Sequence, residues 1–271
     1  MERWHYTENG TGIPLVLLHG VGMSHAAWKP VVPFLSKHRR VIAFDTAGFG
    51  QSLPLAPDSP PTIHNLAKAL ADNLIAIGIT QPVDLVGNSM GGQLALEAAK
   101  LGVAHSVVAI SPSGLWQRHP PRHAKALFFS QRYFAKRFPR LSRWLMGSPM
   151  AREIMLYTAI SPGGRNIPTE DALRIRQDLV SAKAFNSTFL NTEVFADGQR
   201  LTIPITVAFG ARDGILGKAS QRHDTLPAHT RWLEPPRWGH VPMWRDPAGV
   251  AGLILNAQTW TPLERQRTDG Q

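Results

Sequence analysis

The stretch that decides the fold reads Val83-Asp84-Leu85-Val86-Gly87-Asn88-Ser89-Met90-Gly91-Gly92-Gln93. Its first four residues form an apolar run that is too short for a helix and ends at Gly87, which is typical of a buried parallel strand. The residues after Gly92 have the apolar spacing of a helix and enough alanine to pack closely on a sheet. We therefore expect a strand that turns sharply into a helix at Ser89.

The turn around Ser89 has the spacing Gly-x-Ser-x-Gly. The residues two before and two after the serine must be nearly free of side chain where strand and helix approach, and Gly87 and Gly91 meet that need. Such a turn strains the serine backbone and exposes its hydroxyl at the end of the strand. A loop that matches the pattern by chance is the competing interpretation, but the flanking strand and helix argue against it. Ser89 is the predicted nucleophile.

A serine hydroxyl is a weak nucleophile unless a base takes its proton. In chains with this turn the acid and the histidine follow the serine in that order. His240 lies in the loop 238–242, just after the run 231–234 that we expect to be the last strand. A surface histidine is the alternative, but the order of the three residues favours His240 as the predicted base.

The residue that would orient the base is predicted to be Asp213, which follows the apolar run 205–209. A carboxylate at the carboxyl end of a strand can reach the imidazole of a neighbouring loop, fix its tautomer and stabilise its cation. A plain turn aspartate is the competing interpretation, and Asp197 and Asp224 are the alternative acids. The loop after the run 107–110 offers no carboxylate, which strengthens the choice of Asp213.

A tetrahedral oxyanion needs two aimed N–H donors. The first is predicted to be the backbone N–H of Met90, directly after the nucleophile. The second is predicted to come from the loop after the first apolar run, where Val21 follows His19-Gly20. The choice of Val21 depends on motif position alone.

The remaining pattern predicts an α/β fold with a mostly parallel sheet and helices on both faces. The other expected strands are short apolar runs at 15–18, 41–44, 107–110, 205–209 and 231–234, and helical spacing appears at 62–77 and 93–101. Residues 4–8, followed by Asn9-Gly10, predict an antiparallel edge hairpin.

Residues 115–200 break this rhythm and divide the chain into core residues 1–114, a helical cap 115–200 and core residues 201–271. Helical patterns cover 123–138, 150–160 and 169–195, and no clear strand appears between them. An insert of this length is a subdomain at the sheet edge rather than a loop. The tail 264–271 is polar, and we expect it to fray.

Composition narrows the class of protein further. The chain of 271 residues has no cysteine, which excludes disulfides, cysteine catalysis and thiolate metal sites. No apolar run is long enough to span a membrane, and residues 1–5 do not begin a secretory signal. We expect a cytoplasmic enzyme that needs no cofactor and no metal; nothing indicates its oligomeric state.

The net charge of +10 is concentrated in residues 115–152, which contain nine Lys and Arg and no Asp or Glu. On a helical wheel for 122–138, the expected buried side holds Ala124, Leu127, Phe134 and Phe138. The opposite side holds Arg122, Lys125, Arg132 and Lys136, with Phe129 and Tyr133 among them. A solvated surface is the plain interpretation, while an anionic membrane surface, or an acidic partner or substrate, would explain the aromatics. Nucleic acid is favoured least.

Five segments together resemble the α/β-hydrolase fold family over residues 1–114 and 201–260. They are His19-Gly20-Val21-Gly22, Asp45-Thr46-Ala47-Gly48-Phe49-Gly50-Gln51-Ser52, Gly87-Asn88-Ser89-Met90-Gly91-Gly92, Gly210-Ala211-Arg212-Asp213 and Gly239-His240-Val241-Pro242. The resemblance implies that Ser89, Asp213 and His240 are the catalytic residues. It also implies that residues 45–52 form a structural turn with no catalytic role. Serine at position 89 argues against the family's haloalkane dehalogenases and epoxide hydrolases, which use aspartate there.

Two branches of the family resemble this chain. Residues 87–92 resemble the C–C bond hydrolases of aromatic degradation, although the loop after His19-Gly20 lacks their longer glycine-rich form. The regions of Trp28 and Phe44-Asp45 resemble simple carboxylesterases, including the methyl ester esterase that acts on acyl-carrier-protein substrates. We therefore predict a serine hydrolase that cleaves a small-molecule carboxylic ester through an acyl-enzyme. A C–C bond hydrolase and a slow-turnover ligand-binding protein are the alternatives.

Overall fold

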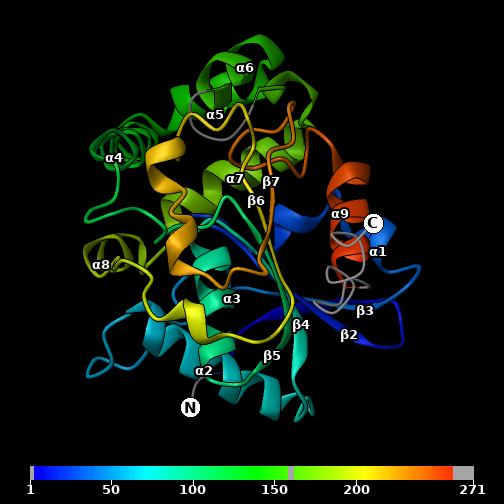
Figure 1. The fold of residues 1–271 in the computed structure, drawn as a ribbon. Coiled ribbons are helices and arrows are strands. Elements are labelled where there is room, and N and C mark those ends of the chain that lie inside the picture. Colours follow the sequence, from blue (N-terminus) through cyan, green and yellow to red (C-terminus); the bar gives the residue numbers. More distant parts are fainter. Residues whose placement is uncertain (1–2, 158–161, 259–271) are drawn as a thin grey trace.

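The computed structural model describes residues 3–157 and 162–258, so the expectation for the tail 264–271 lies outside the described residues. A seven-stranded sheet in the order β1-β3-β2-β4-β5-β6-β7 forms the centre (Figure 1). The strands are β1 Tyr6–Asn9, β2 Pro14–Leu18, β3 Arg40–Phe44, β4 Val83–Asn88, β5 Ala104–Ile110, β6 Ile205–Ala208 and β7 Arg231–Leu233. The helices are α1 Val32–Leu35, α2 Ile63–Ala76, α3 Met90–Lys100, α4 Arg122–Arg137, α5 Pro139–Gly147, α6 Pro149–Tyr157, α7 Thr169–Ser181, α8 Phe185–Leu190 and α9 Pro247–Gln258. Short 3-10 turns are η1 His25–Trp28, η2 Gly164–Asn166, η3 Gly198–Arg200, η4 Lys218–Ser220 and η5 His223–Thr225.

All strand pairs are parallel except the pair of β1 with β3, in which Tyr6 lies opposite Phe44. The expected mostly parallel sheet is confirmed. The expected hairpin at the N-terminus is wrong, because β1 pairs with β3 and not with its chain neighbour β2. Both edges of β2 are already occupied, since it pairs with β3 on one side and β4 on the other.

Helices cover both faces of the sheet because successive strand residues point to opposite sides. On β2, Val16 and Leu18 join an apolar core with α2 and α3, while Leu15 and Leu17 join a second core with α1 and α9. The side chain of Thr62 caps α2 by accepting a hydrogen bond from the Asn65 amide. This two-sided burial fixes the carboxyl ends of the central strands, where the candidate site lies. No helix in residues 3–157 and 162–258 is both long and apolar enough to cross a membrane.

Residues 115–200, which we call the insert, lie between β5 and β6 and contain α4 to α8. The described part of the insert contains no strand, as expected. The sequence pattern missed α5, which begins at Pro139, directly after α4 ends. The pattern 169–195 proves to be two helices, α7 and α8, and α6 ends at Tyr157, so that 158–160 of the expected helix lie outside the described residues.

The expected faces of α4 are partly wrong. Phe129 was assigned to the charged side, but its ring packs at 5.4 and 5.5 Å from the rings of Phe185 and Phe189 in α8. Phe138 was assigned to the buried side and is 45% exposed. Arg132 donates hydrogen bonds to insert carbonyls and lies over the ring of Phe185. The predicted faces are partly wrong because α8 packs against one side of α4. A helical wheel drawn for α4 alone assigns that side to solvent.

Candidate active site

Ser89 occupies a sharp turn between β4 and α3, with φ of 55° and ψ of −117°. Few residues other than glycine adopt a positive φ, so the surroundings must impose this conformation. The Ser89 amide donates to the carbonyl of Ile110 at 2.9 Å. A Cβ on Gly87 would lie 2.0 Å from the carbonyl oxygen of Gly91, and one on Gly91 would lie 2.2 Å from that of Leu18. Both glycines are therefore required for the close approach of α3 to β4 and β2.

His240 and Asp213 come from the loops after β7 and β6, and they meet at the carboxyl edge of the sheet. His240 Nδ1 lies 2.9 Å from Asp213 Oδ2, and the side chains are 3% and 1% exposed. Asp213 Oδ1 accepts hydrogen bonds from the amides of Ile215 and Leu216, both at 2.9 Å. Burial acts to raise the pKa of Asp213, but His240 and the amide donors outweigh it and hold that pKa below its usual value. The carboxylate is therefore ionised and fixed in place.

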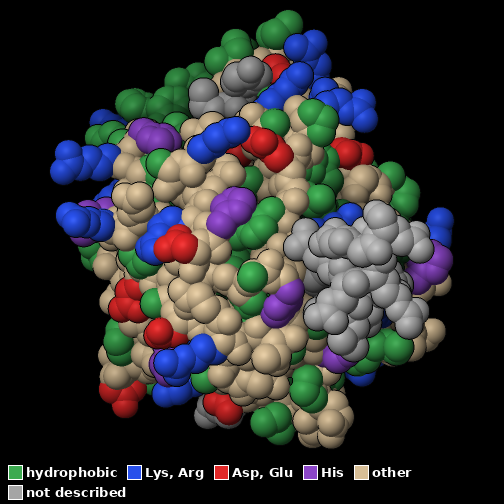
Figure 2. All heavy atoms as spheres, viewed as in Figure 1, with side chains coloured by type: hydrophobic (Ala, Val, Ile, Leu, Met, Phe, Trp, Pro, Cys, Tyr) green, Lys and Arg blue, Asp and Glu red, His purple; other side chains and the backbone are tan. Residues whose placement is uncertain are grey.

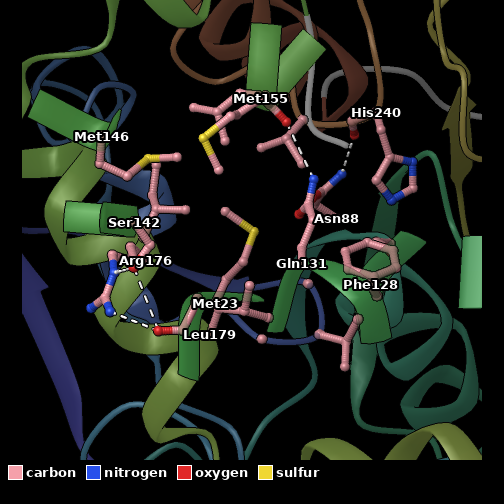
Figure 3. Close-up of a pocket in the computed structure, with 18 residues that line it drawn as sticks. Met23, Asn88, Phe128, Gln131, Ser142, Met146, Met155, Arg176, Leu179 and His240 are labelled. Carbon is pink, nitrogen blue, oxygen red and sulfur yellow. Dashed lines mark hydrogen bonds between the residues drawn. The ribbon is translucent and has the colours of Figure 1, made fainter. Parts of the chain in front are cut away.

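The other nitrogen of His240, Nε2, is buried and has no hydrogen-bond partner among the described residues. Ser89 and His240 both line one cavity beneath the insert (Figure 3). Its other walls are mostly apolar side chains, among them Met23, Phe128, Met146, Met155, Leu156, Ile175 and Leu179. The structure thus places Ser89 and His240 in the lining of one cavity, and it joins Asp213 to His240 by a hydrogen bond.

Asn88 is a positioning residue that the sequence did not single out. It ends β4, is fully buried, and donates through Nδ2 to the carbonyl of His240 at 2.8 Å and to that of Ile110 at 3.1 Å (Figure 3). One side chain therefore ties the histidine loop to the strand that carries the serine. Nothing in its local pattern reveals this, because the partner lies 152 residues away in the chain.

The two predicted oxyanion donors lie beside the serine. Met90 is the first residue of α3, so its amide has no acceptor within the helix. Val21 follows Gly20, where an added Cβ would lie 3.3 Å from that of Ser89. His19 Nδ1 lies 2.7 Å from the Gly20 carbonyl, and its Nε2 accepts from the Thr46 amide. Burial lowers the pKa of His19, so a neutral imidazole clamps this loop.

The insert closes the site and divides the space around the serine. A second, smaller cavity shares Val21, Ser89 and Phe128 with the first. Arg176 also lines the first cavity, and its guanidinium donates to the Ser142 hydroxyl and to insert carbonyls. Ser89 therefore stands at the junction of two cavities.

The alternative acids lie elsewhere. Asp224 pairs with Arg222, whose Nε donates to its Oδ1 at 3.0 Å. Asp197 is exposed and precedes η3. Asp213 is the carboxylate that contacts the His240 ring.

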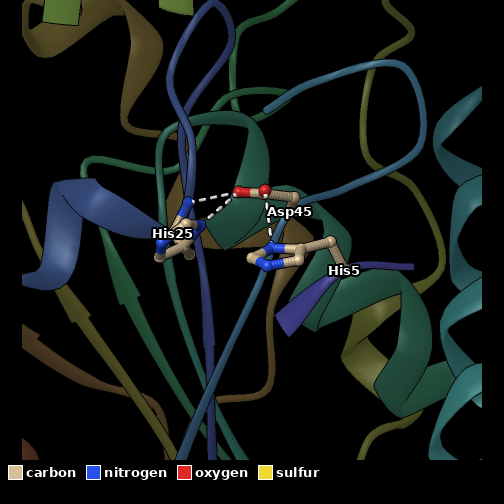
Figure 4. A group of neighbouring side chains, drawn as sticks. All are labelled: His5, His25 and Asp45. Atoms are coloured by element: carbon tan, nitrogen blue, oxygen red, sulfur yellow. Dashed lines mark hydrogen bonds and ion pairs between the residues drawn. The ribbon is translucent and has the colours of Figure 1, made fainter. Parts of the chain in front are cut away.

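One His and Asp group among the described residues has the close spacing of metal ligands. The ligand atoms of His5, His25 and Asp45 all lie within 4.8 Å of one another (Figure 4). Asp45 accepts from both Nδ1 atoms, at 3.0 and 2.9 Å, and from the backbone amides of His25 and Gln51. Burial acts to raise the pKa of Asp45, but the hydrogen bonds from the His25 ring and from the amides of His25 and Gln51 hold it well below its usual range. Because both imidazoles direct a nitrogen to the carboxylate, the group is a hydrogen-bonded clamp.

Comparison with known proteins assigns the fold. A model of the alpha/beta hydrolase family matches residues 15–253, which is most of the chain. The chain belongs to the alpha/beta hydrolase family. The family expected from the sequence is thus confirmed.

Relatives within the family fall into two groups. The pimeloyl-[acyl-carrier protein] methyl ester esterase of Methylococcus capsulatus is 29% identical over 262 residues, which are 91% of this chain and 94% of that protein. The 2-hydroxy-6-oxo-6-(2'-aminophenyl)hexa-2,4-dienoic acid hydrolase of Metapseudomonas resinovorans is 36% identical over 115 residues, 41% of this chain and 39% of that protein. The matches to five such hydrolases span between 32% and 46% of their own lengths.

A solved structure with the same fold is that of a thermophilic esterase from Thermogutta terrifontis. It is 25% identical, has a TM-score of 0.71, and covers 93% of this chain and 92% of its own. The similarity extends over both the sheet and the insert.

Proposed function

We propose that this alpha/beta hydrolase cleaves a carboxylic ester through an acyl-enzyme, with Ser89 as nucleophile, His240 as base and Asp213 as the acid that orients the base. One observation carries the proposal. Ser89 and His240 line the same cavity, and His240 is held through Nδ1 by a buried carboxylate while its Nε2 has no partner among the described residues. A histidine that served packing alone would have both nitrogens satisfied.

The proposed reaction has two halves. Ser89 Oγ attacks the ester carbonyl carbon as its proton passes to His240 Nε2, and the C–O bond to the alcohol then breaks as His240 returns that proton to the alcohol. Water attacks the acyl-enzyme in the same way and releases the acid. The amides of Val21 and Met90 are the proposed donors to the oxyanion, which forms in a site shielded from water where such hydrogen bonds are strong.

The two cavities around Ser89 support an ester with a group on each side of the reacting carbonyl. The apolar walls of the larger cavity suit an apolar acyl or alcohol group. We propose that the insert acts as a cap, because α4, α5, α6 and α7 supply most of those walls. The long match to a methyl ester esterase agrees with ester cleavage.

C–C bond cleavage at the same residues is the second candidate. It is favoured by the higher identity, 34% to 44%, of three dienoate or dienoic acid hydrolases over shorter stretches. Those relatives are named for acidic substrates, and Arg176 is the charged side chain that lines the larger cavity. Its guanidinium is already engaged with the corner between α4 and α5, so the lining agrees better with an ester that is not acidic.

The experiment is a fluorophosphonate probe followed by a turnover assay. The probe should label wild type and not Ser89→Ala, whereas Ser113→Ala, which changes a neighbouring serine hydroxyl, should still be labelled. Turnover of short p-nitrophenyl esters should be many cycles per enzyme and fall several orders of magnitude in Ser89→Ala. Labelling that persists in Ser89→Ala would remove the proposed nucleophile. A single burst without turnover would indicate a ligand-binding protein, and preference for 2-hydroxy-6-oxo-6-phenylhexa-2,4-dienoate would indicate the second candidate.

A further inference from the structure

The outer side of α4, α5 and α6 exposes large apolar side chains. Of the twelve large hydrophobic residues that are exposed in the described parts of the chain, six lie between positions 133 and 154. These six, which we call the apolar face, are Tyr133, Phe138, Leu141, Trp144, Met150 and Ile154, with exposed fractions from 45% to 70%. In Figure 2, hydrophobic side chains gather along the upper edge, where Figure 1 places these helices. Single exposed apolar residues are ordinary, but such a concentration marks a contact surface.

Four cations are interleaved with the apolar face. Lys136, Arg137, Arg140 and Arg143 are exposed, and none forms an ion pair with another residue of the described ranges. Elsewhere, basic residues such as Arg40 pair with carboxylates. Helices α4 and α5 contain no Asp or Glu at all. Their positive charge is therefore not neutralised within their own helices.

Helix α5 carries apolar side chains on both its inner and its outer side. Ser142 and Met146 point inward, are 1% and 5% exposed, and line the larger cavity. Leu141 and Trp144 point outward, with Arg140 and Arg143 beside them. Helix α6 likewise lines the cavity with Met155 and Leu156 and exposes Met150 and Ile154. A surface helix normally keeps its solvent side polar, whereas the outer side of α5 mixes large apolar side chains with arginines.

The combination of apolar side chains and cations on this surface indicates what kind of partner it binds. An anionic bilayer presents negative charge and an apolar interior at one boundary, where Trp and Tyr are the preferred aromatic residues and Lys and Arg meet the headgroups. Nucleic acid would neutralise the cations but leave the aliphatic side chains of Leu141, Met150 and Ile154 in water. We propose that the apolar face and its four cations dock the protein onto an anionic lipid bilayer.

Docking in this orientation places the proposed active site close to the lipid. Helices α5 and α6 would lie in the headgroup region, and their inner sides are walls of the cavity that contains Ser89. The inference goes beyond the proposed function, because binding to a vesicle requires no turnover. The two can therefore fail separately.

The experiment is co-sedimentation of the full chain with vesicles of phosphatidylcholine alone or mixed with phosphatidylglycerol. We expect binding to the anionic vesicles, which weakens as the Debye length falls from about 10 Å at 0.1 M salt to about 3 Å at 1 M. Replacing Lys136, Arg137, Arg140 and Arg143 by Glu should weaken binding by about a hundredfold or more, since each cation near an anionic surface contributes severalfold. The matched control replaces Lys68, Arg200, Arg231 and Arg237, exposed cations outside α4 to α6, by Glu. It has the same net charge and should bind within a fewfold of wild type.

A second variant tests the apolar part. Leu141→Ser combined with Trp144→Ser and Ile154→Ser keeps every charge and should weaken vesicle binding by about tenfold or more. Circular dichroism melting establishes that each variant is folded. No binding to anionic vesicles at low salt, or an equal loss in the two charge variants, would overturn the proposal. Binding to an acidic protein in place of vesicles would overturn it too and identify the other class of partner.

Discussion

Two buried aspartates in this protein each lie against the Nδ1 of a histidine, and their surroundings differ. Asp213 receives one imidazole and two backbone amides, and the opposite nitrogen of that imidazole is left without a partner among the described residues. Asp45 receives two imidazoles and two backbone amides (Figure 4). The first, which we call the open group, includes a residue that lines the cavity of Ser89, whereas no residue of the second, which we call the closed group, lines that cavity.

The comparison separates two uses of the same side chains. Both carboxylates have a pKa below the usual value, for the same physical reason: hydrogen-bond donors outweigh burial. A lowered pKa therefore does not distinguish a proposed catalytic aspartate from one that holds segments together. What distinguishes them is position: His240 lines the cavity that contains Ser89, and its Nε2 has no partner among the described residues, as a base requires.

The largest expected effect is a loss of turnover on changing Asp213 in the open group. In Asp213→Asn, the amide oxygen can still accept from the Ile215 and Leu216 amides, so we expect the fold to persist. The amide NH₂ would then face His240 Nδ1, which must become an acceptor, and the proton would move to Nε2, where it blocks the base. Turnover of a p-nitrophenyl ester should fall by about a thousandfold or more.

The matched control is Asp224→Asn, which removes an exposed carboxylate that was an alternative acid and should leave turnover within about twofold. Near-normal turnover in Asp213→Asn together with severe loss in Asp224→Asn or Asp197→Asn would show that the wrong carboxylate was chosen. The melting temperatures of all three variants distinguish a catalytic from a folding defect.

The sheet and the insert differ in how far they can be predicted from sequence. Strands β2 to β6 follow from short, mostly apolar runs, because a strand buried on both faces lacks the polar alternation of a half-exposed strand. The order of serine, acid and histidine likewise led to the choice of Asp213 and His240, which are hydrogen-bonded, and of Ser89, which lines the same cavity as His240. Two features of the core were not predictable, namely the pairing of β1 with β3 and the bond from Asn88 to the His240 loop, since both depend on partners distant in the chain.

In the insert, the sequence predicts helices but misses α5, and the faces predicted for α4 are partly wrong. Ring contacts with α8 decide that Phe129 points inward, and the corner before Pro139 leaves Phe138 exposed. Arg132 looked like part of a charged surface but donates to the carbonyls of Leu179 and Ala182. A wheel describes one helix, whereas these helices bury different sides against different neighbours.

The second-largest expected effect is a loss of stability on changing Asp45 in the closed group. Asp45→Asn replaces a fully buried acceptor by an amide, and its NH₂ would oppose N–H donors from His5, His25 or Gln51. Leaving buried donors unpaired should cost about 2–4 kcal/mol in free energy of unfolding. For a chain of this size the melting temperature would fall by roughly 5–12 °C.

Turnover per folded molecule should change little in Asp45→Asn, which is the reverse of the result expected for Asp213→Asn. Differential scanning calorimetry and the ester assay on the same samples give both quantities. Loss of turnover with normal melting would contradict the division between the open and closed groups.

The smallest expected effect is the pH dependence of the difference in unfolding free energy between wild type and Asp45→Asn. The pKa of Asp45 is lower in the folded protein than the value of about 3.9 for an unfolded chain. Its ionised form therefore stabilises the fold fully above pH 4, and the stabilisation is lost as pH falls toward the folded pKa. Asn does not titrate, so the difference in unfolding free energy between wild type and Asp45→Asn should shrink by about 1 kcal/mol between pH 7 and pH 3. Urea unfolding at both pH values measures it, with the exposed Asp58→Asn as the control that should show no such change. A difference that stays constant would mean that Asp45 holds the clamp through its shape and hydrogen bonds and not through its charge.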